Sequence, residues 1–118
     1  MGLDQYAYAT YSGKGRKSQR VELAYWRKHS NLEGYMSNLY EEKTGDNDVF
    51  NCKQLYLDTD DLDLLAETIV NGDLPQTTGF FFGESDPSQE QIDTDLEFIN
   101  KARWHLGEGF RVYYTSWW

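Results

Sequence analysis

The chain has 118 residues, 39% of them apolar, and its 20 acidic and 11 basic side chains give a net charge of -9. This length fits one domain with its own core, and an aromatic content of 16% excludes a chain that stays disordered. The negative charge disfavours nonspecific binding to nucleic acid or to an anionic membrane surface. No apolar run approaches the about 20 residues that span a membrane. A single cysteine, Cys52, excludes an intramolecular disulfide and fits a reducing cytosol.

The first third of the chain predicts a strand, a polar loop and a helical region. Tyrosines that alternate with small residues predict a strand over residues 5–11, and glycines with several bases predict an exposed loop over 12–19. Apolar residues spaced three and four apart predict helix over 21–40. Ser30 and Glu33 have the spacing of a capping box, so one long helix and two short helices that break near Ser30 both fit.

The middle of the chain predicts a strand followed by a helix. Alternation over residues 50–57 is typical of a strand buried on both faces, with Cys52 buried inside it. Thr59 is the predicted N-cap of a helix whose first turn is acidic, as the positive end of the helix dipole favours. Asn71 and Gly72 tolerate left-handed geometry and are expected to end this helix.

The last third of the chain predicts a helix and a closing strand. Residues 79–83, three phenylalanines between glycines, form either a short buried strand or an aromatic loop. Asp86 and Pro87 suit the start of a helix that Gly107 ends. Alternation over 110–118 predicts the final strand.

These elements predict one α+β domain over residues 1–118. Segments that favour strands lie at both ends of the chain, with helices between them. We therefore expect a mainly antiparallel sheet that contains both terminal strands, covered on one face by three or four helices.

The residue types that carry catalysis or bind metals form no recognisable motif. His29, His105 and Cys52 lack the paired spacing of a zinc site. The aspartates within 58–63 lack the glycine and the distant glutamate of a calcium loop and are expected as first-turn residues. We predict no catalytic residue, metal ion or cofactor. An enzyme in which Cys52, His29 or His105 meets a carboxylate in one cleft is the third-ranked alternative.

One set of residues is a candidate site for a small anionic ligand such as a nucleotide. The basic loop lacks the spacing of a P-loop, so a plain connector and a loop that holds an anion both stay open. For Trp26 and Arg27 two interpretations stay open. Either the Trp26 indole packs in the core and the neighbouring basic side chains point to solvent, or the Arg27 guanidinium binds a phosphate. The candidate ligand-binding residues are Arg16, Lys17, Arg20, Trp26, Arg27 and Trp117.

A second set of residues predicts an interface with a macromolecule. Alternation along the final strand places Trp117 and Trp118 on opposite faces of the sheet, so one indole packs inward while the other reaches the surface. Aromatic side chains at a surface favour protein contacts. Together with Asp60 and Asp61, the two indoles are the predicted interface residues. A homodimer is an open alternative to a foreign partner.

Several blocks of the sequence are shared, in the same order, with known proteins. They are MGLD at the start, ELAYWRKH at 22–29, FNC at 50–52, GFFFG at 79–83 and YYTSWW at the end. In these blocks the chain resembles a family of small, mostly uncharacterised bacteriophage-encoded proteins. Where the family tends to have His-Gly-Trp, this chain has a Glu-Gly-Tyr run that begins at Glu33, which removes a histidine. Some members are labelled phosphoglycerate kinase, but 118 residues are too few for that enzyme's two domains.

The resemblance implies a phage accessory protein that acts in the cytoplasm of an infected bacterium. We expect a non-catalytic binding protein that engages or inhibits a host macromolecule, with a host protein as partner, for takeover or counter-defence. The alternative is a protein that binds or sequesters a small anionic ligand such as a nucleotide, using the basic N-terminal loop and a stacked tryptophan.

Overall fold

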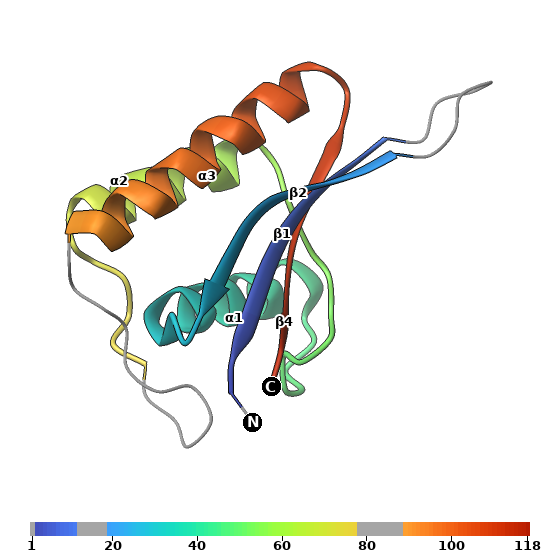
Figure 1. Cartoon of the computed structure of the whole chain (residues 1–118). Helices are drawn as coiled ribbons and strands as arrows, with labels where there is room; N and C mark the ends of the chain where they lie inside the picture. The colour runs from blue at the N-terminus through green and yellow to red at the C-terminus, as the bar shows by residue number, and fades with distance from the viewer. Residues whose placement is uncertain (1, 12–18, 78–88) are drawn as a thin grey trace.

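The computed structural model describes residues 2–11, 19–77 and 89–118, in which four strands form one antiparallel sheet and three helices pack against it (Figure 1). The strand order is β2-β1-β4-β3. In chain order the elements are β1 (Asp4–Tyr11), β2 (Gln19–Arg27), α1 (Ser30–Thr44), β3 (Leu55–Leu57), α2 (Thr59–Val70), α3 (Gln89–Gly107) and β4 (Arg111–Trp117). This arrangement confirms the predicted α+β fold.

The two terminal strands both belong to the sheet, as predicted, and they pair with each other at its centre (Figure 1). Asp4 lies opposite Trp117, and Thr10 lies opposite Arg111. Successive side chains of a strand point to opposite faces, so one face of β1 carries alanines and the other carries tyrosines. Ala7 is completely buried, because helices pack closely over its face.

The hydrophobic core lies between the three helices and one face of the sheet. Helices α2 and α3 run side by side (Figure 1), and α1 adds its own buried face to the same core. The core side chains are Ala7, Ala9, Leu23, Trp26, Leu55, Leu57, Val112 and Tyr114 from the sheet, Phe50 from the segment before β3, and Leu32, Met36, Leu62, Leu65, Ile69, Phe98, Ile99 and Ala102 from the helices. In the described part of the chain, no helix is both long and apolar enough to cross a membrane.

The helix predicted over residues 21–40 is wrong in its first part, because residues 19–27 form the edge strand β2. The pairing with β1 shifts by one residue between Ala7 and Tyr8, which leaves Leu23 as an extra residue in β2. Such a bulge places two consecutive residues on one face. Leu23 and the neighbouring alanine therefore both pack on the core, and this spacing imitates a helical stripe.

Neither one long helix nor two helices that meet near Ser30 is correct, because strand β2 precedes α1, which begins at Ser30. The predicted capping box is also wrong. His29 occupies the N-cap position and makes no side-chain cap hydrogen bond. Lys28 just before it has a positive φ of 59°, and this turn lets the chain leave the sheet. Glu33 points into the protein and is only 1% exposed, so it does not reach back to the helix start.

Of the strand predicted over residues 50–57, only the last part, β3 (Leu55–Leu57), is a strand in the structure. Cys52 is exposed and has a φ of 60°, which corrects the expectation that it is buried in a strand. Its backbone N–H donates to the carbonyl oxygen of Ser116 over 2.7 Å. The chain around Cys52 therefore contacts the end of β4 through a turn and not through an extended strand.

The two remaining helices lie close to their predicted positions. Asp58, not Thr59, is the N-cap of α2, and it forms a capping box with Asp61. The helix gives way to Gly72, whose φ is 72°, as predicted. Helix α3 ends at Gly107, also as predicted. The predictions for residues 79–83 and for Asp86 and Pro87 lie outside the described residues.

Candidate functional site

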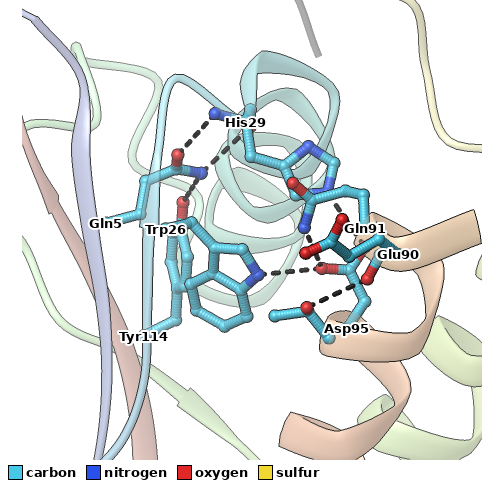
Figure 2. A network of polar contacts seen from close by, with 8 residues as sticks. Gln5, Trp26, His29, Glu90, Gln91, Asp95 and Tyr114 are labelled. Carbon is cyan, nitrogen blue, oxygen red and sulfur yellow. Dashed lines mark hydrogen bonds and ion pairs between the residues drawn. The ribbon is translucent and has the colours of Figure 1, made fainter. Parts of the chain in front are cut away.

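A buried glutamine joins the start of α1 to the sheet (Figure 2). The Gln5 side chain is fully buried, and its Nε2 donates to the carbonyl oxygen of His29 over 3.0 Å and to the hydroxyl of Tyr114 over 2.8 Å. Its Oε1 accepts the backbone N–H of His29 over 2.9 Å. Gln5 thus contacts both backbone groups of the N-cap residue and holds the start of α1 against the sheet.

The same network continues to a buried carboxylate on α1. The hydroxyl of Tyr114 donates to Oε1 of Glu33 over 2.7 Å, and Oγ of Ser116 donates to Oε2 over 2.9 Å. Burial raises the pKa of Glu33, although hydrogen bonds from Tyr114, Ser116 and Trp118 act in the opposite direction. Burial and the adjacent Glu33 raise the pKa of Tyr114 well above its ordinary value. The sequence analysis did not identify Glu33 as a site residue. Its position between the apolar residues Leu32 and Met36 is the feature of the sequence that could have indicated burial.

A second buried group holds α3 against β2 (Figure 2). Nε2 of His29 lies 2.9 Å from Oδ2 of Asp95, and Nε1 of Trp26 donates to Oδ1 of Asp95 over 2.8 Å. Gln91 donates to the same Oδ1 over 3.1 Å. Among the described residues, every buried side-chain nitrogen and oxygen has a hydrogen-bond partner. The His29–Asp95 pair is therefore part of a satisfied core network that fixes the fold.

A pocket of about 270 Å³ lies beside the buried carboxylate. One wall is a face of α1, and the remaining walls come from the segment before β3, the segment after α2 and the C-terminus. Its lining residues are Glu33, Gly34, Ser37, Asn38, Val49, Phe50, Thr77 and Trp118. A Cβ added to Gly34 would lie 1.9 Å from Oγ1 of Thr77, so only glycine allows this close approach.

The sheet face that points away from the helices carries a continuous row of tyrosines, which we call the tyrosine face. Neighbouring ring centroids lie 5.2–6.0 Å apart along the row Tyr25, Tyr6, Tyr8, Tyr113 and Tyr56. These cross-strand contacts stabilise the sheet. The described helices all lie on the opposite face of the sheet, so the tyrosine face is free of them.

Three of the five charged residues on the tyrosine face are arginines. The pairing of β1 with its two neighbours places Arg20, Arg27 and Arg111 on this face, together with Asp4 and Glu22. The guanidinium of Arg111 lies 4.0 Å from the ring centroid of Tyr56, and that of Arg20 lies 4.8 Å from that of Tyr8. Three arginines and two acids give this face a net charge of +1, in a chain whose net charge is -9.

The predicted ligand residues that the structure describes, Arg20, Trp26, Arg27 and Trp117, do not form one pocket. Arg20 and Arg27 are exposed on the tyrosine face, whereas Trp26 is 3% exposed and packs against Phe98 in the core. This corrects the proposed stacking role of Trp26, because the core leaves no ring face open to a ligand. Arg16 and Lys17 lie outside the described residues.

The two terminal indoles point to opposite faces, as predicted. Trp117 is 63% exposed on the tyrosine face. Trp118 is partly buried, and its Nε1 donates to the carbonyl oxygen of Phe50 over 3.0 Å. The aspartates predicted to join them are on α2, behind the other face of the sheet. Asp60 is exposed there, and Asp61 is occupied by its capping role and by an ion pair with Lys43.

The remaining candidates for chemistry are dispersed. Sγ of Cys52 lies 3.6 Å from Oδ1 of the preceding asparagine at the surface, while His29 is buried against Asp95. Nδ1 of His105 lies 2.8 Å from the carbonyl oxygen of Lys101 within α3. Within residues 2–11, 19–77 and 89–118, no group of three or more metal-ligating side chains has the arrangement to hold a metal ion.

Searches of the chain against protein-family models, against curated proteins and against solved structures gave no match.

Proposed function

We propose that this chain is a non-catalytic binding protein that engages an acidic segment of a host protein through its tyrosine face. The supporting observation is the composition of that face, on which Tyr25 and Trp117 are 47% and 63% exposed beside three arginines. Tyrosine, tryptophan and arginine are the residue types that carry most of the binding energy at protein interfaces. The resemblance to phage-encoded proteins is the reason for proposing a bacterial host as the source of the partner.

Charge distinguishes a protein partner from a nucleic acid. The tyrosine face is positive while the chain as a whole is strongly negative. A nucleic acid carries a dense line of phosphates and is repelled by the chain at long range. An acidic protein segment presents only a few carboxylates, which the arginines of this face complement at short range. This comparison favours a protein partner.

The alternative function is the binding of a small anionic ligand, and it is supported by two arginines of the tyrosine face. Arg20 and Arg111 lie opposite the same residue of β1, Thr10, from the two neighbouring strands. Two guanidinium groups on the strands that flank β1 suit an anion such as a phosphate or a carboxylate. The ligand would stack on tyrosine or on Trp117, since the core encloses Trp26.

Two exposed tryptophans provide a matched test. Trp117 is 63% exposed on the tyrosine face, and Trp104 is 61% exposed on α3. Each is changed to alanine, a partner captured from bacterial lysate is identified and purified, and its affinity for the three proteins is measured. We expect Trp117→Ala to weaken binding by about tenfold or more and Trp104→Ala to leave it unchanged. Arg111→Ala is expected to weaken the complex and to reduce its dependence on salt.

Three results would count against the proposal. Equal weakening by both tryptophan variants would show that the tyrosine face is not the specific contact. Sensitivity to Trp104→Ala alone would move the interface to α3. Binding of an oligothymidylate that depends on Trp117, without any protein partner, would assign the face to nucleic acid.

A further inference from the structure

The pocket beside Glu33 is independent of the tyrosine face, because it lies on the helix-covered side of the sheet. Glu33 is only 1% exposed, yet it is one of the residues that line a pocket of about 270 Å³. Both carboxylate oxygens of Glu33 are held by donors, Tyr114 on one side and Ser116 on the other. The carboxylate is therefore fixed in position before any ligand arrives.

No ion pair compensates this carboxylate within the described part of the chain, where the four ion pairs of lysine or arginine and the His29–Asp95 contact all involve other acids. A buried charge without an opposite charge nearby is costly, and hydrogen bonds from neutral hydroxyls compensate only part of that cost. Charged carboxylates in a core are normally paired, and the other buried acid, Asp95, lies 2.9 Å from the imidazole of His29. The pocket is the position from which a cation can reach Glu33.

The other walls of the pocket suit a small cation with an apolar body. Ser37, Asn38 and Thr77 supply hydroxyl and amide groups that accept hydrogen bonds from an ammonium or guanidinium. Phe50 and Trp118 supply aromatic surface, which attracts cations. The volume is below that of a pocket for a drug-sized ligand, about 300–1,000 Å³, so the ligand has few heavy atoms.

We propose that the Glu33 pocket binds a small organic cation, a primary amine or a guanidinium compound, with Glu33 as its counter-ion. The carboxylate contacts the charged group of the ligand, while the hydroxyls of Tyr114 and Ser116 keep it oriented. This site is separate from the partner surface proposed above and does not require it.

The proposal is tested by NMR titration of the whole chain with n-butylammonium and with methylguanidinium. N-methylurea, a neutral compound of the same shape as methylguanidinium, serves as the reference ligand. We expect saturable shifts at the amides of Gly34 and Thr77 and at the indole N–H of Trp118 with the cations. N-methylurea is expected to bind about tenfold or more weakly, because it lacks the charge-assisted hydrogen bond.

Three variants assign the binding to the carboxylate. Glu33→Gln removes the charge and keeps the shape, and we expect it to weaken cation binding by about tenfold or more. Glu41→Gln removes the same charge from an exposed position on the same helix and is expected to change nothing. Ser37→Leu fills the pocket without altering the acid and is expected to abolish the shifts, which keeps the proposal testable if Glu33→Gln does not fold.

Several outcomes would overturn the proposal. They are equal binding of N-methylurea and methylguanidinium, cation shifts that persist in both Glu33→Gln and Ser37→Leu, and the absence of saturable shifts with either cation in the unmodified chain.

Discussion

Replacing Tyr114 with phenylalanine removes one oxygen atom from the centre of the buried network. The hydroxyl accepts a hydrogen bond from Gln5 and donates one to Glu33, and both partners are fully enclosed. The aromatic ring remains, so its contacts with Trp26 and Phe50 are preserved. The substitution therefore isolates the polar contribution of this one group.

The expected loss of stability follows from the two hydrogen bonds. A neutral hydrogen bond contributes about 0.5–1.5 kcal/mol, and one to a charged group about 1.5–3 kcal/mol. Losing both predicts a decrease of about 2–4.5 kcal/mol in the free energy of unfolding. With an unfolding entropy of about 2.1 cal/mol/K per residue, a chain of 118 residues would lose about 8–18 °C in Tm.

Urea denaturation followed by circular dichroism measures this change at several pH values. The hydrogen bond from Tyr114 lowers the pKa of Glu33, so its loss raises that pKa further above the ordinary value of 4.5. A protein that contains an acid whose pKa is raised in the folded state becomes more stable as the pH falls through that pKa. The deficit of Tyr114→Phe at pH 7 should therefore shrink as the pH approaches 4.5, the ordinary pKa of this carboxyl.

Tyr113→Phe is the matched control, since Tyr113 is the adjacent residue on the opposite face of the sheet. Its hydroxyl has no hydrogen bond to any residue that the structure describes, and we expect a change within about 0.5 kcal/mol. Equal effects of Tyr113→Phe and Tyr114→Phe would refute the reasoning, because the buried network would then contribute nothing specific.

Three further predictions concern Glu33, Gly34 and Cys52. Glu33→Gln removes a carboxyl group whose pKa is raised by burial. The stability of this variant relative to the unmodified chain, measured by urea denaturation, should therefore be highest at pH 7 and decline as the pH falls toward 4.5. Gly34→Ala favours a helix by about 1 kcal/mol, but its Cβ would lie 1.9 Å from Oγ1 of Thr77, so the melting temperature should fall. Cys52 is exposed and should react with a disulfide reagent such as DTNB in the folded protein, without denaturant.

Each of these predictions has a clear contrary result. A stability difference for Glu33→Gln that is constant from pH 7 to the acid range would mean that this carboxyl titrates normally. An increase in melting temperature for Gly34→Ala would show that the neighbouring segment moves away without loss. A thiol of Cys52 that reacts only after unfolding would restore the prediction of a buried cysteine.

The sheet was predictable where alternation was regular and pairing was simple. Burial alternates along most of β1, whereas Val112, Tyr113 and Tyr114 of β4 are all buried. Both terminal strands, and the opposite directions of Trp117 and Trp118, were nevertheless predictable from the sequence. The sequence of β2 predicts a helix instead of a strand, because the bulge at Leu23 interrupts the period of two. Irregular pairing is a property of two strands together, and it is not visible in either strand alone.

The buried polar residues were not predictable, because their partners are distant in the sequence. Glu33 and Tyr114 are 81 residues apart, and His29 and Asp95 are 66 residues apart. Local spacing suggested that Glu33 caps a helix, which is the usual role of a glutamate at that position. Only the register of β1 against β4, with the helix start held by Gln5, shows that this side chain turns inward.

Hydroxyl-radical footprinting of the chain, alone and in complex with its captured partner, tests the central claim most directly. The account predicts that complex formation protects Tyr25 and Trp117 on the tyrosine face, while Trp104 on α3 stays as reactive as in the free chain. Protection of Trp104 with unchanged reactivity at Tyr25 and Trp117 would contradict it.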